Sequence, residues 1–254
     1  MVHKIRIGLI GYGKTGKAVA NVLCSDSRFE LCWIARRTVS DKIKTHPNTT
    51  IPIIGIAQQS FEQLLNRHPV DAIIDFSSPE AVHAYGETVR KHSIMLVSAI
   101  SVYSESDLDY VRSLGRNTRV MCSPNITLGV NFLMTAANLL RKIAPFADVE
   151  ILEQHFKEKP EVSGTALKIA EKLGVEDDKI TSLRLGGIIG EHEVIFGFPH
   201  QTVRLVHSSI RREAFGTGAA FALSQLATRD KGFYTFEDLL IHVAYNESPK
   251  PSNC

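Results

Sequence analysis

The stretch Gly11-Tyr12-Gly13-Lys14-Thr15-Gly16 decides the fold of this chain. It follows the apolar run 5–10, which is typical of a buried strand, and precedes apolar residues at helical spacing. At such a junction Gly11 permits a tight turn, Gly13 lets the backbone approach a pyrophosphate, and Gly16 allows close helix packing. The helix start adds free N–H groups and a positive dipole end. The segment therefore predicts a dinucleotide site rather than a simple glycine turn.

The end of the second predicted strand, 29–34, bears on the choice of cofactor. A carboxylate at this point would favour NAD, because it binds the ribose hydroxyls. The chain instead has Ala35-Arg36-Arg37, and two guanidinium groups suit the additional phosphate of NADP. We therefore expect Arg36 and Arg37 to bind the cofactor, with NADPH preferred and NADH possible. The alternative is a solvated pair of arginines in a loop.

Composition excludes several classes of protein. The 254 residues are 44% hydrophobic and 22% charged with a net charge of +2, which suits one large or two modest domains and implies neither nucleic acid nor a membrane as partner. We see no cleavable N-terminal segment and no apolar run near the roughly 18 residues of a membrane span, so we expect a cytoplasmic protein. The chain has four cysteines, Cys24, Cys32, Cys122 and Cys254. They lack the spacing of a metal-binding or redox motif, which predicts reduced thiols and no bound metal.

Strand-like and helix-like segments alternate through the first half. The expected strands are 70–76, 94–100 and 119–122, and the expected helices are 79–92 and 104–114. Repeated βα units predict a doubly wound parallel sheet, the α/β fold class. Pro79 suits the first turn of its helix, so the loop before it lies at the carboxyl edge of a strand. Ligands of such sheets bind there, and we assign Phe76 of this loop to the cofactor.

The pattern changes around Ser123-Pro124-Asn125-Ile126-Thr127. We then expect a long helix at 128–145, a strand at 148–154, one helix and a β-rich stretch at 183–208, which together form an α+β domain. Its apolar strand positions exceed what one short helix can cover, so an oligomer built through this sheet is expected. A further helix is expected at 218–226. The predicted domains are 1–126 with 213–254 for the dinucleotide, and 127–212 for substrate binding and oligomerisation.

A second site is predicted at the helix that follows Ser163. Ser163 suits the N-cap position, and the free N–H groups of Gly164 and Thr165 then form an anion site. A lysine beside other cations can donate a proton near neutral pH. Together these features suit a small carboxylate-bearing substrate, and the protonatable residues just upstream are His155, Lys157 and Lys159. The alternative is a solvated charged loop that only caps the helix.

At these residues the chain resembles a known family. Glu153-Gln154-His155, Lys159, Ser163-Gly164-Thr165-Ala166-Leu167 and Gly190-Glu191-His192 are similar to segments of the 4-hydroxy-tetrahydrodipicolinate reductases of diaminopimelate and lysine biosynthesis. The likeness extends over nearly the whole chain. It implies a Rossmann-type domain, a substrate domain that mediates a homotetramer, and hydride transfer from NAD(P)H to a small dicarboxylate.

The resemblance also implies roles by position. His155 matches the catalytic histidine and Lys159 the proton-donating lysine, and the substrate contacts are Phe156, Ser163, Gly164 and Thr165. The matched cofactor contacts are Gly11, Tyr12, Gly13, Lys14, Thr15, Gly16, Arg36, Arg37, Phe76, Ser98, Ala99, Ile100, Ser123, Pro124, Asn125 and Ile126. Two places depart from the family pattern. Phe156 stands where a second histidine is usual, and Ser98-Ala99-Ile100-Ser101 replaces a Gly-Thr-Thr turn.

Two alternatives remain open from the sequence. One is another NADP-dependent dehydrogenase of amino-acid metabolism with the same two-domain plan, acting on aspartate semialdehyde, homoserine or meso-diaminopimelate. The segment 163–166 argues against it. The other is a catalytically silent NADP-binding sensor, which only the departures at Phe156 and 98–101 support.

Overall fold

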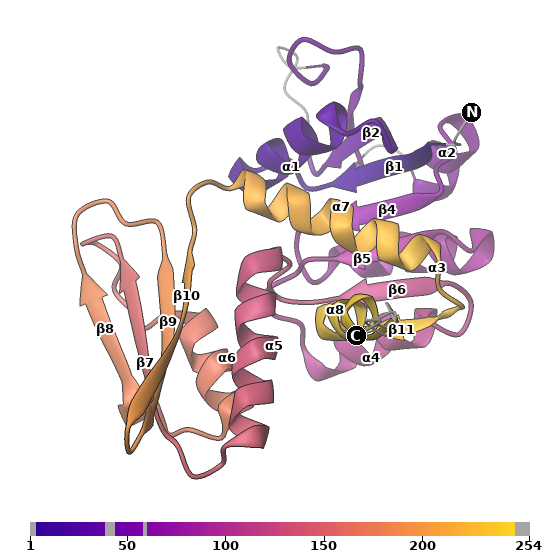
Figure 1. Ribbon diagram of the computed structural model, residues 1–254. Coiled ribbons are helices and arrows are strands. Elements are labelled where there is room, and N and C mark those ends of the chain that lie inside the picture. Colours follow the sequence, from indigo (N-terminus) through magenta and orange to yellow (C-terminus); the bar gives the residue numbers. More distant parts are fainter. Residues whose placement is uncertain (1–3, 39–43, 58–59, 247–254) are drawn as a thin grey trace, which may run out of the picture. The chain divides into compact units, whose positions relative to one another are not determined.

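The chain forms two compact units (Figure 1). The computed structural model describes residues 4–38, 44–57 and 60–246. The first unit comprises Met1–Ile126 with Phe215–Cys254, and the second comprises Thr127–Ala214. The segment Ser123-Pro124-Asn125-Ile126-Thr127, where the sequence pattern changes, thus contains the junction between the units.

The first unit is built on a seven-stranded sheet in the order β11-β6-β5-β4-β1-β2-β3, with every adjacent pair parallel. Its strands are β1 (Ile5–Ile10), β2 (Phe29–Arg36), β3 (Ile53–Gly55), β4 (Ala72–Asp75), β5 (Met95–Ser98), β6 (Arg119–Cys122) and β11 (Gly232–Tyr234). The strand order reverses between β1 and β4, which places a ligand crevice at their carboxyl ends. The expected doubly wound parallel sheet is confirmed.

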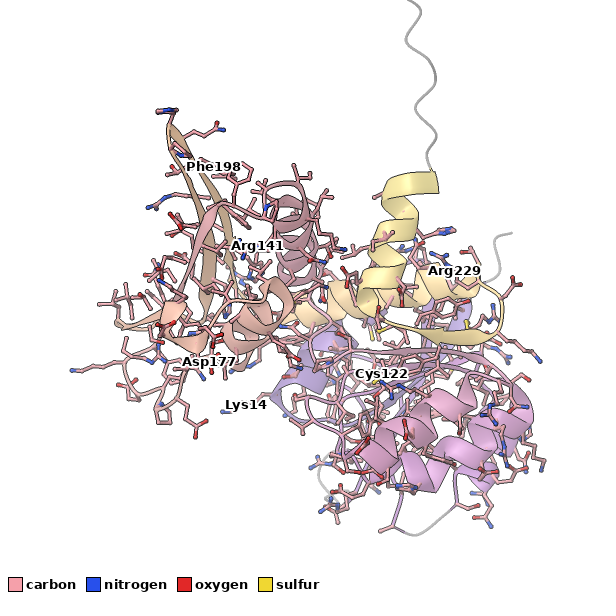
Figure 2. All side chains as sticks on the ribbon, turned by 90° about the horizontal axis from the view of Figure 1, so that it is seen from below. Lys14, Cys122, Arg141, Asp177, Phe198 and Arg229 are labelled. Carbon is pink, nitrogen blue, oxygen red and sulfur yellow. The ribbon has the colours of Figure 1, made fainter. Side chains whose placement is uncertain are left out.

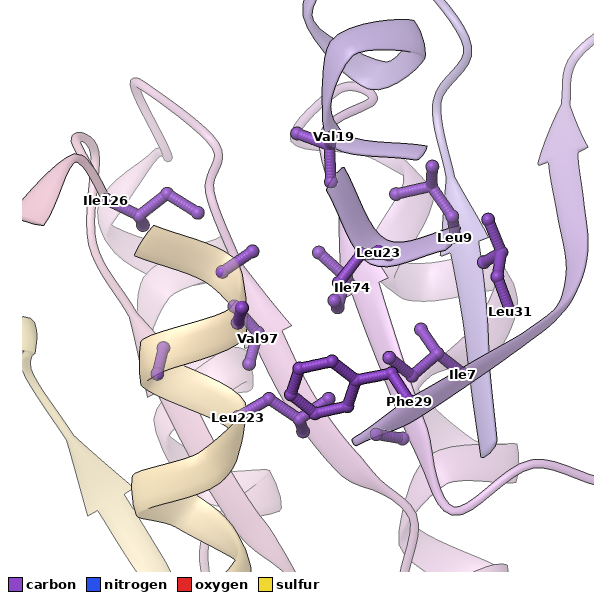
Figure 3. Packing of buried hydrophobic residues seen from close by; sticks show 14 of the residues in the cluster. Ile7, Leu9, Val19, Leu23, Phe29, Leu31, Ile74, Val97, Ile126 and Leu223 are labelled. Carbon is purple, nitrogen blue, oxygen red and sulfur yellow. The ribbon is translucent and has the colours of Figure 1, made fainter. Parts of the chain in front are cut away.

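Helices cover both faces of this sheet, and apolar side chains fill the space beneath them. One face carries α1 (Lys14–Ser25), α7 (Glu213–Ala227) and α8 (Phe236–Asn246), which bury Leu9, Phe29 and Ile74 (Figure 3). The other carries α2 (Phe61–Arg67), α3 (Ala81–His92) and α4 (Glu105–Leu114), which bury Trp33 and Leu96. Removing such apolar area from water stabilises the fold by about 25 cal/mol per Å².

Several element ends differ from the sequence-based expectations. Helix α3 begins at Ala81 rather than Pro79, because the chain first makes a turn in which the Ala81 amide bonds to the Ser78 carbonyl. Helix α7 begins five residues before the expected 218 and contains Gly216. A Cβ on Gly216 would lie 2.6 Å from Val22, so this glycine serves close packing and does not end the helix. The short elements β3, α2 and β11 were not predicted.

The second unit is a mixed α+β domain, as expected. Its sheet has the order β10-β9-β7-β8, with β7 and β8 parallel and the other pairs antiparallel. Its elements are α5 (Leu128–Ile143), β7 (Asp148–His155), α6 (Gly164–Leu173), the 3-10 turn η1 (Asp177–Lys179), β8 (Ile180–Arg184), β9 (Glu191–Phe198) and β10 (Gln201–Ser208). Arg141 of α5 is labelled in Figure 2. It donates to the carbonyls of Pro145 and Ala147, which closes the turn into β7.

Both α5 and α6 pack on one face of this smaller sheet. The buried cluster joins Leu133 and Ala137 of α5, Ile169 of α6, and Ile151 and Phe196 of the strands. The sequence led us to expect a single helix on this sheet, which was wrong. The long apolar helix after residue 127 folds back on the strands because its own apolar stripe needs a partner surface.

No helix in the described part of the chain is long and apolar enough to span a bilayer. Among the described residues, no cluster of His, Cys, Asp and Glu could hold a metal ion. Cys24 and Cys32 are free thiols, Cys122 is buried at the end of β6, and Cys254 lies outside the described residues. Burial raises the pKa of the Cys24 and Cys32 thiols.

Candidate active site

The glycine turn between β1 and α1 is shaped to admit a phosphate group. Gly11 has φ +93°, and a Cβ on it would lie 2.7 Å from the backbone of Phe76. A Cβ on Gly16 would lie 2.1 Å from the Gly11 carbonyl oxygen, so both positions require glycine. At Gly13 a Cβ would meet nothing within 4 Å. Open space thus lies beside Gly13 at the N-terminus of α1, where backbone N–H groups favour an anion.

A cavity of about 420 Å³ runs from this turn to the end of β2. Arg36 is the last residue of β2 and is partly exposed, and Arg37 is exposed beside it. Both line the cavity, together with Gly11, Gly13, Thr38, Ser77 and Ser78. The space therefore has a glycine turn at one end and two guanidinium groups at the other, which suits a phosphorylated ligand.

A second cavity, of about 410 Å³, lies at the carboxyl ends of β4, β5 and β6. The predicted cofactor residues that line it are Thr15, Phe76, Ala99, Ile100, Pro124 and Ile126. Ser77 lines both cavities, so they adjoin at the loop after β4. The tertiary structure thus gathers predicted cofactor residues from several loops along one edge of the sheet.

Two predicted cofactor residues have side chains turned inward. Tyr12 is buried, and its hydroxyl lies 2.6 Å from Nδ1 of His46. Ser98 is completely buried, and its hydroxyl lies 2.8 Å from that of Tyr103. Both hydroxyls therefore have partners within the protein. The serine that replaces the family's glycine is therefore satisfied within the protein.

The buried carboxylate of Asp75 holds the loop that the two cavities share. Its Oδ1 accepts from the amide of Ser77 at 2.8 Å and from the Ser77 hydroxyl at 2.5 Å, and its Oδ2 accepts from Tyr85 at 2.6 Å. Burial raises the pKa of Asp75, against the opposing effect of these hydrogen bonds. Ser123 closes a neighbouring loop by donating to the Asn125 carbonyl.

In the second unit, strand β7 presents a buried pair of polar side chains. Residues along β7 alternate between buried and more exposed, so Glu153 and His155 follow Val149 and Ile151 on the buried face. Nδ1 of His155 lies 2.5 Å from Oε2 of Glu153. The catalytic histidine predicted from the sequence is thus paired with a buried carboxylate.

Three further donors surround the other oxygen of Glu153. Oε1 accepts from the Ser163 amide at 3.2 Å, the Ser182 hydroxyl at 2.7 Å and the Arg184 guanidinium at 2.8 Å. Burial alone would raise the pKa of Glu153, but hydrogen bonds from Arg184, Ser182 and His155 together outweigh it and lower the pKa to about 2. Glu153 is therefore ionised at neutral pH.

Helix α6 begins immediately after Ser163, as predicted, but the serine side chain does not cap it. The Ser163 hydroxyl instead lies 2.8 Å from Nε2 of His192 on β9. This partner arises because β7 and β9 pair with Glu153 opposite His192, next to the start of α6. Because the Ser163 side chain does not cap the first turn, the N–H groups of Gly164 and Thr165 can serve an anion.

His192 is a buried neutral histidine at physiological pH. Burial lowers its pKa to about 4, and the nearby rings of His155 and His207 act in the same direction. Its ring meets that of His155 edge to face at 5.4 Å. Gly190 packs closely against the ring of His155, since a Cβ there would lie 3.0 Å from its Nε2.

The loop between β7 and α6 carries Lys159 and Phe156. Lys159 is partly exposed, and its amide bonds to the Phe156 carbonyl in a turn. The Phe156 ring is 41% exposed, so it does not belong to the core. Both side chains lie beside the start of α6 in sequence, and both remain accessible to a ligand.

Sequence reasoning assigned no role to Glu153, Ser182, Arg184 or His192. The alternation along β7 carried a signal for Glu153, because the charged residue occupies a position of the buried face. No local pattern indicated a role for Ser182 or Arg184. Their contacts with Glu153 depend on the parallel register of β7 and β8, which sets them opposite Glu153 and His155.

Comparison with protein families identifies the chain. The N-terminal part of the dihydrodipicolinate reductase family matches residues 5–126, and its C-terminal part matches residues 127–240. The chain belongs to the dihydrodipicolinate reductase family. Members of this family are NAD(P)H-dependent oxidoreductases of lysine biosynthesis, so the enzyme class and the resemblance inferred from the sequence are confirmed.

Individual relatives cover almost the whole chain. The 4-hydroxy-tetrahydrodipicolinate reductase of Caldanaerobacter subterraneus is 30% identical over 90% of this chain and 94% of its own length. That of Thermosipho africanus is 29% identical over 93% and 98%. The solved structure of a dipicolinate-bound dihydrodipicolinate reductase from Paenisporosarcina has a TM-score of 0.79 at 22% identity, covering 92% of this chain and 98% of that one. The last comparison supports the fold.

Proposed function

We propose that this chain reduces 4-hydroxy-tetrahydrodipicolinate to tetrahydrodipicolinate with NADPH as the preferred cofactor, and that His155 and Lys159 are its catalytic residues. The observation that carries the proposal is the buried Glu153–His155 pair beside the uncapped start of α6. It joins a protonatable ring to an anion site, which a reductase of a dicarboxylic substrate requires.

The residues that would hold the cofactor fit its shape and charge. Gly13 and the N-terminus of α1 would receive the pyrophosphate, and Arg36 and Arg37 would receive the 2′-phosphate. Phe76 and Ile126 line the cavity that would take the nicotinamide. When bound there, NADPH supplies a hydride. NADH would lack the contacts to the two guanidinium groups, which supports the preference for NADPH.

The start of α6 is the proposed substrate site. The N–H groups of Gly164 and Thr165 would bind one carboxylate of the substrate, helped by the positive end of the helix dipole. The structure from Paenisporosarcina holds dipicolinate, which agrees with a dicarboxylate ligand for this family. Phe156, exposed on the adjacent loop, would form a wall of the pocket.

The proton steps are assigned to the loop and the strand end. The reaction adds a hydride and a proton to the ring and releases one water, so a proton donor must stand near the reacting carbon–nitrogen system. Lys159 carries a transferable proton on a flexible side chain and is the proposed donor. His155, held by Glu153, would orient the substrate through the Nε2 edge of its ring.

A homotetramer built through the sheet of the second unit is part of the proposal. The face of this sheet away from α5 and α6 exposes apolar side chains, among them Leu183 at 38% and Val206 at 56%. Arg204 and Glu193 form an ion pair across the strands on that face. A symmetric contact between sheets would bury these groups. Sedimentation analysis tests the assembly.

The assay that tests the function follows the loss of NADPH absorbance with freshly generated substrate. We expect turnover that depends on both components. Turnover with aspartate semialdehyde or meso-diaminopimelate instead would replace the substrate assignment. Binding of NADPH without turnover on any of these substrates would contradict the catalytic roles of His155 and Lys159.

A further inference from the structure

The ion pair of the buried Glu153 and the partly exposed Arg184 connects three parts of the proposed active site. Glu153 is 0% exposed and contacts His155 through Oε2 and the Ser163 amide through Oε1. The guanidinium of Arg184 lies 2.8 Å from Oε1. One carboxylate thus joins the histidine at the end of β7 to the first residue before α6.

Arg184 also holds the loop that carries Lys159. Its Nε donates to the Lys159 carbonyl at 3.0 Å, and its Nη2 donates to the Glu161 carbonyl at 2.7 Å. These contacts attach the segment between β7 and α6 to β8, on which Arg184 is the last residue. The position of the Lys159 backbone therefore depends on the same guanidinium that neutralises Glu153.

We propose that Glu153 and Arg184 are positioning residues for the reductase reaction: Glu153 selects the tautomer of His155 and anchors the start of α6, and Arg184 holds the Lys159 loop. The inference rests on the proposed roles of His155, Lys159 and the α6 start. Neither residue is assigned a direct contact with substrate. Both act through the groups they hold.

Stability alone is a weak explanation for such a pair. Burying two charges costs several kcal/mol per ion in desolvation, and apolar replacements of similar volume are often as stable. The position of the hydrogen bonds explains the pair better, because every donor or acceptor that they engage belongs to β7, β8 or the segment leading into α6. The low pKa of Glu153, about 2, keeps the carboxylate an acceptor throughout the neutral range.

An ionised carboxylate dictates which nitrogen of His155 carries the proton. Because Glu153 can only accept, Nδ1 of His155 must donate, and in the neutral ring Nε2 is left unprotonated. The variant Glu153→Gln should invert this arrangement. Three donors still surround the position of Oε1, so the amide oxygen will occupy it and the amide NH₂ will face His155. Nδ1 must then accept.

The first experiment reads the tautomer directly. Nitrogen NMR of the full chain, labelled at histidine and free of ligands, should show His155 protonated at Nδ1 in the wild type and at Nε2 in Glu153→Gln. The signal is assigned by its loss in His155→Asn. An unchanged tautomer in Glu153→Gln overturns the role of Glu153. Because no substrate is present, this result stands even if the proposed function fails.

The second experiment tests Arg184 with a matched control. Arg184→Ala should raise the KM for the dicarboxylate and lower kcat, with a combined loss of roughly 10²-fold in kcat/KM, since small displacements of catalytic groups cost that much. The Kd of NADPH, measured by fluorescence, should not change. The control Arg6→Ala removes an ion pair with Asp71, also 2.8 Å long, near the start of β1 in the first unit, and should retain wild-type kinetics.

Conservative variants keep the test decisive if Arg184→Ala does not fold. Arg184→Lys preserves a charge for Glu153 but cannot reach Glu153 and both carbonyls at once, so it should fold and lose kcat/KM. A folded Arg184→Lys with wild-type kinetics, or an Arg6→Ala loss equal to that of the Arg184 variants, overturns the proposal. A wild-type protein that does not reduce the substrate contradicts the proposed function, while the tautomer measurement still decides the role of Glu153.

Discussion

The hydroxyl of Ser163 and Nε2 of His192 lie 2.8 Å apart, and this bond joins the start of α6 to strand β9. Ser163 would otherwise be expected to cap its own helix, so the bond to His192 leaves the helix start open. Burial lowers the pKa of this imidazole to about 4, so it is uncharged at neutral pH. His192 is 5% exposed, and its Nδ1 has no hydrogen-bond partner among the described residues.

We expect His192 to make the protein acid-sensitive. Burial lowers its pKa from 6.5 to about 4, so the unfolded chain binds the proton more readily than the folded one. The stabilisation is complete above about pH 6.5 and is lost as the pH falls toward 4. The loss should be roughly 3 kcal/mol at about 1.4 kcal/mol per pKa unit.

Urea unfolding at several pH values measures this effect. His192→Gln should show a shallower dependence of the free energy of unfolding on pH than the wild type across that window. The wild-type dependence also includes His46 and His207, whose pKa values burial lowers, so only the difference between proteins is interpreted. His200→Gln, at an exposed position, is the control. Parallel curves for wild type and His192→Gln would disprove the assignment.

Gly190→Ala should impair catalysis by moving His155. The added Cβ would lie 3.0 Å from Nε2, closer than ordinary contact, so the imidazole must shift by some tenths of an ångström. We expect a fall in kcat of roughly 10- to 10²-fold. Gly187→Ala is the matched control, because a Cβ there meets nothing within 4 Å. Steady-state kinetics compares the kcat values of the two variants. Equal kcat values would show that catalysis does not need the space that Gly190 leaves beside His155.

Lys159→Ala should remove most turnover while leaving the affinity for NADPH nearly unchanged. The lysine belongs to the second unit, and the residues proposed to bind the cofactor belong to the first. Loss of a general acid costs roughly 10²–10⁴-fold in rate. Lys157→Ala, on the same loop and exposed, should have little effect. Near wild-type turnover in Lys159→Ala would make Lys159 a solvated loop residue.

Changing Arg36 and Arg37 together to Ala should weaken NADPH binding more than NADH binding. Each guanidinium contact to the 2′-phosphate contributes about 1.5–3 kcal/mol, and NADH lacks that group. Both side chains line the same cavity as the glycine turn. Fluorescence titration with each cofactor measures the difference. Equal losses for the two cofactors would remove the phosphate contact from the proposal.

Phe156→His should lower the KM for substrate with little cost in stability. The ring is 41% exposed, so a polar replacement leaves no buried group unsatisfied. A new neutral hydrogen bond to the dicarboxylate should contribute on the order of 0.5–1.5 kcal/mol. Melting temperature and KM are measured together. A large drop in melting temperature without a kinetic gain would place Phe156 in the packing of the domain.

The sequence by itself determined the features that depend on neighbouring residues. The glycine turn, the βα alternation and the start of α6 are local, because turn geometry and periodicity involve residues a few positions apart. The family was also recognisable from short segments. These local signals were enough to predict both sheets and most of the helices.

Only the tertiary structure decided where the polar side chains point. Tyr12 and Ser98 turn inward to His46 and Tyr103, and Ser163 bonds to a histidine 29 residues away rather than to its own helix. Arg184 reaches Glu153 across 31 residues. Such partners are set by strand register and by the need to satisfy buried polar groups, and neither is visible in a local pattern.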